Sequence, residues 1–590
     1  MKRMTRQPLW IALSMAGVLL VASCAPAAQP APAPPTPAPA APTAPAAPAP
    51  QATPTRAPAA QAIPTPLPTP PLRPTPAPIA APSAFAWPPG APQRGGTLVG
   101  MHQSRVATLD LHRESSAQVP YVVQSVYNGI LMFHPDGSYR IVPDLAESWT
   151  SSEDGRTITF RLRSGIKFHD GAPLTADDAI FSLNRQMNPP RGMPSPRGGI
   201  LQSVVERIEK VNDLTFVVRL KYPSASFLNI VASGWMAVMP KRLLEKNNDA
   251  LVPTAVGTGP FKLKRFEVGA VTVAERNPDY WNKGLPYLDG YQMLFVPDQA
   301  TRWAAMRTKR VQISGLGSAS LQLDEVASVA RDKLDIAIVD AYSNRGYGLV
   351  FNHARKPFND VRVRRAFALA SDPQEVIQVA FQGEGLMIGL IGYPRWGTPA
   401  DQLSKFPGYR KPGQTDLDEA KRLLREAGYG SGLKVTALMR TTAIDRRVMP
   451  VVQQQVGRVG IDLALQPLEI APMFERYEQQ NFDTGLIAIS EPIDDPDVLL
   501  RNWYHTQGTR NYGKFSDPEI DRLLEEQSKI AEFQKRNAVV MRAEQLLMEK
   551  VAALELTVAK YSQAYWKNLE GYRPYDIYNS WRYDWAYFKK

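Results

Sequence analysis

The spacing of hydrophobic residues predicts alternating strands and helices over residues 95–590. Residues 157–163 alternate with period two, so Ile158, Phe160 and Leu162 share one face, as a half-buried strand requires. The turn pair Asp154-Gly155 comes just before this segment. Because such strand signals alternate with helix signals along the chain, we expect a mixed α/β fold.

Several helices are predicted from apolar faces and capping signals. One is expected from about Val361 to Ala370, stopping before Asp372-Pro373. A second ends near Gly428, a plausible C′ residue, and its apolar face consists of Leu417, Ala420, Leu423, Leu424 and Ala427. Capping boxes are predicted for two further helices, formed by Thr175 with Asp178 and by Ser516 with Glu519, the latter with Pro518 in the first turn.

The first 24 residues have a different pattern. Lys2, Arg3 and Arg6 precede an apolar run from Leu9 to Leu20, which is shorter than the roughly 20 residues of a membrane-spanning helix. Such a segment is typical of a secretory signal. The following Val21-Ala22-Ser23-Cys24 resembles the lipobox of bacterial lipoproteins, in which the chain is cut before the cysteine and the cysteine then carries lipid. An uncleaved anchor and a secreted protein with a free thiol are the alternatives.

Residues 24–94 are predicted to form a linker that begins with Cys24, the only cysteine of the chain. Residues 25–94 contain 25 of the 54 prolines, much alanine and only three charged residues, Arg56, Arg73 and Arg94. This composition lacks the apolar bulk for a core, and Pro-rich chains favour extended polyproline II. We expect a tether that holds a folded domain away from the membrane, or a passive spacer.

The remaining 496 residues are too long for a single core, so two or three domains are expected. The formal charge of +12 includes three positive charges before residue 24 and three in the linker. The rest of the chain carries no basic run with interleaved aromatic residues, which argues against a nucleic-acid partner.

Motifs of catalysis and metal binding are missing from the sequence. The six histidines are scattered, and neither HExxH nor CxxC occurs, so no zinc site of usual spacing is expected. Gly257-Thr258-Gly259-Pro260 lacks the Lys-Ser/Thr of a phosphate loop, and no GxSxG elbow occurs. His169 is interpreted as a turn residue. We therefore expect neither an enzyme nor a bound cofactor or metal.

A cluster of four carboxylates at residues 491–497 is the strongest local signal, and it follows the strand-like segment 484–490. A strand that ends in carboxylates could receive an amine or a cation. Alternatively, the segment is a solvated loop whose aspartates cap a helix that starts near Val498.

Several segments together resemble the extracellular solute-binding proteins of family 5, the dipeptide-, oligopeptide- and nickel-binding components of ABC importers. The matching segments occur in order along the chain: Pro143–Trp149, Asp154–Asp178, Gly257–Phe261, Asn277–Trp281, Phe351–Asp372, Ala420–Tyr429, Asp495–Asp497 and Asp517–Leu524.

The resemblance implies a periplasmic-binding-protein-like α/β fold of type II, with two lobes, a hinge and an extra small domain. The expected boundaries are 1–23 for the signal, 24–94 for the linker, 95–125 with 254–335 and 556–590 for lobe I, 126–253 for the small domain, and 336–555 for lobe II. The solute would bind between the lobes.

The resemblance also implies site residues. In peptide-binding relatives an arginine after a strand binds the ligand carboxylate, and Arg440 matches it by its spacing to Asp445-Arg446-Arg447. Ser490 and Glu491 match a strand that offers backbone hydrogen bonds to a peptide, and Asp494 and Trp503 complete the expected ligand contacts. Many members have an aspartate that binds the amino group of the ligand, and this chain has Pro492 at that position. A sugar-derived, capped or otherwise non-standard solute therefore remains an alternative to a peptide with a free amine.

The function expected from this resemblance is a lipid-anchored, extracytoplasmic receptor of an ABC importer. It would be a monomer that captures peptide-like solutes and delivers them to permease subunits. The alternatives are a binder of an oligosaccharide-like solute or a nickel chelate, and an anchored extracellular hydrolase.

Overall fold

The computed structural model describes residues 92–113, 118–136, 140–315, 321–391, 396–489, 493, 495–530, 532–573 and 582–589. The chain divides into two compact units, Met1–Arg73 and Pro74–Lys590, and all elements below belong to the second. The predicted signal segment, Cys24 and nearly all of the linker lie outside the described residues. The predicted α/β fold is confirmed, because sheets and helices alternate along the described chain.

A first group of elements surrounds a four-stranded sheet of order β1-β10-β9-β8. Its strands are β1 (Thr97–His102), β8 (Phe261–Glu267), β9 (Val271–Arg276) and β10 (Gly290–Phe295), and only β1 with β10 is a parallel pair. Helix α1 (Gln118–Val123) and the short η1 (Gln124–Val126) pack on it, as do the C-terminal β17 (Leu569–Glu570) and β18 (Tyr587–Phe588). We call this set the β10 group.

A second set, the β5 group, contains an antiparallel sheet of order β4-β5-β7-β6. The strands are β4 (Ala146–Ser151), β5 (Thr157–Leu162), β6 (Val205–Asn212) and β7 (Thr215–Leu220), next to the pair β2 (Leu131–Phe133) and β3 (Ile141–Pro143). Helices α2 (Ala176–Met187), α3 (Gly198–Val204), α4 (Phe227–Ala232) and α5 (Lys241–Leu244) belong to it. Its core includes stacked Phe160 and Phe216, with ring centroids 5.2 Å apart.

The third set, the β13 group, contains a six-stranded sheet of order β12-β16-β11-β15-β13-β14. Its strands are β11 (Ile336–Phe351), β12 (Gly385–Leu386), β13 (Leu433–Arg440), β14 (Ile461–Leu468), β15 (Thr484–Ile489) and β16 (Ala553–Trp566). Strand β13 is parallel to both β14 and β15, whereas the other pairs are antiparallel.

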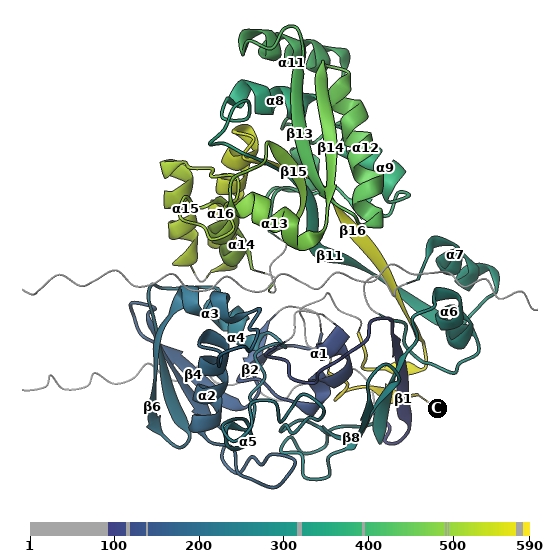
Figure 1. Ribbon diagram of the computed structural model, residues 1–590. Helices are drawn as coiled ribbons and strands as arrows, with labels where there is room; N and C mark the ends of the chain where they lie inside the picture. The colour runs from purple at the N-terminus through teal and green to yellow at the C-terminus, as the bar shows by residue number, and fades with distance from the viewer. Residues whose placement is uncertain are drawn as a thin grey trace, which may run out of the picture. The chain divides into compact units, whose positions relative to one another are not determined.

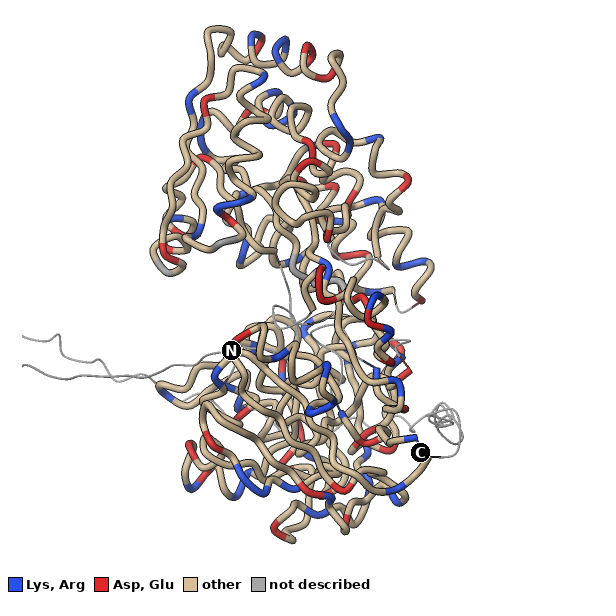
Figure 2. Tube along the Cα trace, turned by 90° about the vertical axis from the view of Figure 1, so that its right-hand side faces the viewer, with Lys and Arg blue, Asp and Glu red and all other residues tan. Residues whose placement is uncertain are grey.

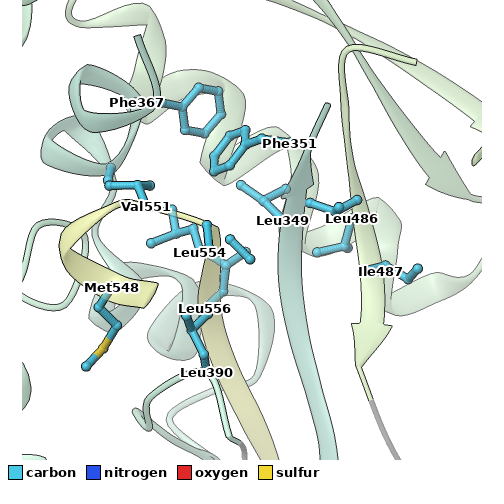
Figure 3. Packing of buried hydrophobic residues seen from close by; sticks show 14 of the residues in the cluster. Leu349, Phe351, Phe367, Leu390, Leu486, Ile487, Met548, Val551, Leu554 and Leu556 are labelled. Carbon is cyan, nitrogen blue, oxygen red and sulfur yellow. The ribbon is translucent and has the colours of Figure 1, made fainter. Parts of the chain in front are cut away.

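Nine helices of the described chain belong to the β13 group. They are α8 (Val361–Ala370), α9 (Pro373–Ala380), α10 (Ala400–Leu403), α11 (Gln414–Glu426), α12 (Ala443–Gly457), α13 (Ile470–Glu478), α14 (Pro496–Tyr504), α15 (Pro518–Ser528) and α16 (Phe533–Glu549). Figure 3 shows Leu349 and Phe351 of β11 in the same packed region as Leu554 of β16 and Phe367 of α8.

Strands β11 and β16 are the long connections between the β13 group and the β10 group (Figure 1). One half of their ladder pairs Ile336–Tyr342 with Trp566–Lys560, and the other pairs Gly346–Val350 with Val558–Ala553. The register shifts between Tyr342 and Gly346, which marks a bulge between the two halves. Helices α6 (Gln299–Arg307) and α7 (Leu323–Arg331) lie near the first half.

Most local predictions are confirmed. The strand at 157–162, the helix Val361–Ala370 and the capping interaction in which Asp178 accepts a hydrogen bond from the backbone N–H of Thr175 are all present. Helix α11 is followed by Gly428 with φ +91°, the left-handed conformation expected at C′. His169 lies in a turn, where the backbone N–H of Gly171 donates to the carbonyl of Phe168.

The prediction that Ser516 caps α15 is wrong. The N-cap is Asp517, whose carboxylate accepts hydrogen bonds from the N–H groups of Glu519 and Ile520 at 3.0 and 3.2 Å. The reason is Pro518 at the first helical position, because a residue before proline is kept out of the helical region and therefore serves as the cap.

Charged residues of both signs are interspersed along the described trace (Figure 2). Among the described helices, none is long and apolar enough to cross a membrane.

Candidate functional site

The carboxyl ends of three strands meet at one edge of the β13 sheet. Strands β13, β14 and β15 run in the same direction and end at Arg440, Leu468 and Ile489. Strand β11 runs the opposite way and brings Gly346 beside Ile489. In α/β sheets this edge is the usual place for a ligand, so the candidate site is built from these strand ends.

Arg440, the last residue of β13, is paired within the chain. Its Nε and Nη2 donate to the Asp445 carboxylate at 3.0 and 2.6 Å, and its backbone N–H donates to the same group at 2.9 Å. Within the described part of the chain, Nη1 has no hydrogen-bond partner. The side chain of Arg440 is 13% exposed and that of Asp445 is fully buried. The guanidinium is therefore held in place, with Nη1 unpaired among the described residues.

Two tyrosines complete the surroundings of Arg440. Its guanidinium carbon lies 5.9 Å from the ring centroid of Tyr347, which follows Gly346 on β11. Burial lowers the pKa of Arg440, but the hydrogen bonds and charge of Asp445, with Tyr347 and Tyr477 nearby, outweigh burial and leave the pKa above its usual value. The arginine therefore stays positively charged, as recognition of an anionic group requires.

The sequence reasoning used Asp445 only for its spacing to Arg440 and missed their ion pair, and it missed Tyr347. Asp445 could have been found, because Thr442 and Asp445 have the spacing of a helix cap, and the N–H of Asp445 does donate to the Thr442 hydroxyl at the start of α12. Tyr347 offered no such signal, because its place beside Arg440 depends on the pairing of β11 with β15.

The other predicted ligand contacts divide into two sets. Ser490, Glu491 and Asp494 lie outside the described residues, as does Pro492. Trp503 lies on α14, is buried, and packs edge-on against Tyr512 at 5.9 Å. Tyr512 in turn stacks on Tyr477 at 5.7 Å. An aromatic series thus connects Trp503 with the surroundings of Arg440.

Asp495 and Asp497, in the acidic segment after β15, are buried. The alternative interpretation that they lie in a solvated loop is therefore wrong for both. Asp495 is fully buried, caps α14 through the N–H of Asp497 at 3.0 Å, and binds the Arg536 guanidinium at 2.5 and 2.8 Å. Asp497 accepts from Arg501 at 3.0 Å and from Gln527 at 2.5 Å. The predicted capping role is confirmed, but both carboxylates are built into a core network.

Another buried acid, Glu555 of β16, lies opposite Gly348 of β11. Only 1% of Glu555 is exposed, and within the described residues its Oε1 has no hydrogen-bond partner. A Cβ on Gly346 would lie 2.4 Å from this oxygen, so the carboxyl group occupies space that only glycine leaves open. Burial raises the pKa of Glu555 well above its usual value.

Among the described residues, no group of three or more His, Cys, Asp or Glu side chains is placed to hold a metal ion. Two histidines contact backbone carbonyls within the fold: Nε2 of the buried His112 lies 2.9 Å from the Ala237 carbonyl, and Nε2 of the half-buried His353 lies 2.8 Å from that of Ala552.

The chain is similar to known proteins over most of its length. Residues 140–511 match the family model of bacterial extracellular solute-binding proteins, family 5 Middle. The glutathione-binding protein GsiB of Salmonella paratyphi A is 27% identical over 481 residues, covering 80% of this chain and 90% of that protein. Di/tripeptide-binding protein 2 of Pseudomonas aeruginosa is 27% identical over 480 residues, covering 76% and 86%.

The fold has a similar solved structure. The periplasmic binding protein DppA of Helicobacter pylori, associated with an ABC transporter and solved with the peptide STSA, superposes with a TM-score of 0.67 at 24% identity, covering 84% of this chain and 99% of that one. The expected type II periplasmic-binding-protein fold is therefore confirmed. The model match covers well over half of the chain, and the protein belongs to the bacterial extracellular solute-binding proteins of family 5.

Proposed function

We propose that this protein is the lipid-anchored receptor of an ABC importer, and that it captures peptide-like solutes and delivers them to a membrane permease. The β10 group would form lobe I, the β5 group the small domain, and the β13 group lobe II. The two relatives named above bind glutathione and di- or tripeptides, which share a free carboxylate. The anchor would be the lipid on Cys24, with residues 24–94 as the tether.

The observation that carries the proposal is the placement of Arg440 at the carboxyl edge of the β13 sheet, next to the hinge strand β11. Its pairing with Asp445 fixes the guanidinium, and Nη1 is left for a ligand carboxylate. A fixed arginine loses little conformational entropy when it binds an anion. The bulge of β11 between Tyr342 and Gly346 is where a closing motion would bend the chain.

The test is a thermal-shift and calorimetric titration of the soluble chain with glutathione, dipeptides, tripeptides and an oligosaccharide panel. A solute at 100 times its dissociation constant should stabilise the native state by about 2.7 kcal/mol. Binding of a peptide with a free C-terminus, together with loss of binding when the same peptide is C-terminally amidated, would support the proposal. Binding of oligosaccharides alone would assign another solute class, and turnover of an ester or peptide panel would replace the receptor by a hydrolase.

A further inference from the structure

A short segment of the β5 group, residues 222–229, reaches the start of α14 in the β13 group. The side-chain amide of Asn229 donates to Oδ2 of Asp495 at 2.7 Å, and the Ser226 hydroxyl donates to Oδ2 of Asp497 at 3.0 Å. The backbone N–H of Ala225 donates to the Ser528 carbonyl at 2.8 Å. Figure 1 shows α4, which begins in this segment, near α14. We call residues 222–229 the latch segment.

Apolar and aromatic contacts accompany these hydrogen bonds. The Arg501 guanidinium carbon lies 4.6 Å from the ring centroid of Tyr222. Ile493 and Val498, which flank the two aspartates, are buried in the same hydrophobic cluster as Phe227 and Ile230. The contact therefore surrounds the N-terminal end of α14, directly after the segment that follows β15.

The two aspartates that accept the latch hydrogen bonds also have partners that compensate their charge within the β13 group. Asp495 already binds Arg536, and Asp497 already binds Arg501 and Gln527, all within the β13 group. If Asn229 and Ser226 moved away, both carboxylates would keep charged or polar partners. A contact of this kind can be made and broken without leaving an unpaired buried charge.

A cavity that opens to solvent borders the latch. A cavity of about 440 Å³ opens beside Asn229 and Arg536, with Leu228 on one side and Trp396 and Phe533 on the other. The cavity opens to solvent, so water reaches the edge of the latch, unlike a closed core.

The β5 group is fastened to the β10 group more strongly, through buried ion pairs. Arg185 of α2 binds Asp110 at 3.1 and 2.7 Å, and both side chains are almost fully buried. Arg582 of the C-terminal segment binds Asp144 at 2.7 Å, again with both side chains buried. A rotation of the β13 group about β11 and β16 would therefore break the latch and leave these ion pairs intact.

We infer that Asn229 and Ser226 are positioning residues of the solute site, which latch the β5 group onto the start of α14 when the molecule closes. This inference rests on the proposed receptor function and deepens it. The latch adds to the stability of the closed form and fixes α14 at the end of the candidate edge. Since apparent affinity scales with the population of the binding-competent form, loss of the latch weakens binding by a faster release of solute.

The test combines two measurements on Asn229→Ala and on the double variant Asn229→Ala/Ser226→Ala. Asn188→Ala is the matched control, because Asn188 is exposed at the end of α2 in the same β5 group. The first measurement is the association and dissociation rate of the peptide probe that binds most tightly among glutathione and the di- and tripeptides. We expect dissociation to become roughly 10-fold faster while association changes less than 2-fold.

The second measurement needs no solute. Spin labels at Val211→Cys in the β5 group and Ile470→Cys in the β13 group, both exposed in the native chain, report the distance between the groups in a Cys24→Ser background. The latch variants should shift the distance distribution away from that of the unmutated and Asn188→Ala proteins. If no probe binds but the shift occurs, the latch stands and the receptor function fails. An unchanged distribution, or unchanged dissociation rates in a protein that does bind, overturns the latch.

Discussion

The guanidinium of Arg440 and the carboxylate of Asp445 form a two-point ion pair at the carboxyl end of β13, with Nε and Nη2 at 3.0 and 2.6 Å from the aspartate oxygens. The carboxylate is also held by the Thr442 hydroxyl at 2.8 Å. The pair fixes the direction in which the remaining nitrogen of Arg440 points, and this direction is the basis of the proposed carboxylate recognition.

Replacing Arg440 should remove recognition of a solute carboxylate. Arg440→Ala is expected to weaken binding of a peptide with a free C-terminus by roughly 10- to 100-fold, because a charge-assisted hydrogen bond is lost. The C-terminally amidated form of the same peptide should bind the variant and the unmutated protein with similar affinity. Calorimetric titration of both peptides makes this comparison. Equal losses for the two peptides would show that Arg440 supports the fold and not the carboxylate.

The buried pair of Asp495 and Arg536 should be much more sensitive than an exposed pair on the same helix. Arg536→Met leaves the Asp495 charge without its buried cation and should lower the free energy of unfolding by about 3–5 kcal/mol. Arg542, also on α16, pairs with Glu519 at 3.7 Å, and both side chains are about half exposed. Arg542→Met should cost less than about 1 kcal/mol. Urea unfolding followed by circular dichroism measures both values, and similar costs would contradict the structure.

Glu555→Gln should stabilise the protein, and more so at higher pH. Burial raises the pKa of Glu555 in the folded state, whereas the unfolded chain releases this proton near pH 4.5. Folding therefore favours the protonated acid, and this contribution to stability is lost as the pH rises above 4.5. Glutamine is neutral at every pH, so the difference in Tm between variant and unmutated protein should grow from pH 5 to pH 9.

Glu544→Gln is the contrasting variant. Glu544 is equally buried, but its oxygens accept hydrogen bonds from the backbone N–H groups of Ile391 and Thr398. A glutamine amide would turn a donor toward one of these N–H groups, so Tm should be lower than that of Glu555→Gln at every pH. Destabilisation by Glu555→Gln as well would mean that the Glu555 carboxylate has a partner that stabilises its charged form.

Three histidines with lowered pKa values should make the protein less stable in mild acid. Burial lowers the pKa of His112 and of His169 to about 4, and that of His353 to about 3 with help from the nearby Arg364 charge. The unfolded chain takes up these protons near pH 6.5, so stability is lost as the pH falls from 6.5 toward 4. Tm measured between pH 7 and pH 5 should decrease, and His353→Gln should reduce the slope. A flat profile would show that these rings take up protons over the same pH range in the folded and the unfolded chain.

Cys24→Ser should separate anchoring from binding. If Cys24 carries the lipid, the variant should appear in the soluble fraction of cells while the unmutated protein stays with the membrane. Solute affinity should be unchanged, because the candidate site and the latch segment consist of residues after 220. Fractionation followed by titration of the purified proteins measures both properties. A loss of binding in the variant would contradict the division into anchor, tether and receptor.

Local sequence was a good guide wherever a neighbour along the chain determines the structure. The strand 157–162, the helix Val361–Ala370 and the C′ glycine Gly428 follow from periodicity and backbone preference, and all three are confirmed. The wrong cap, Ser516, also depends on local sequence, because Pro518 at the first helical position makes Asp517 the N-cap. The same reasoning could not find that Asp495 and Asp497 are buried, because their partners Arg536 and Gln527 lie 41 and 30 residues away.

By itself, the sequence determined the α/β class, the family and the place of Arg440 at the end of a strand, because short-range periodicity and motif order carry this information. Only the tertiary structure decided what surrounds that strand end: Tyr347 from β11, the buried Glu555 of β16, and the contact of Asn229 with Asp495 across 266 residues. Such neighbours are set by the pairing of strands and the packing of groups that are distant in the chain. Burial then changes the chemistry of each side chain, since a carboxylate that would be solvated in a loop becomes a paired or protonated group inside the fold.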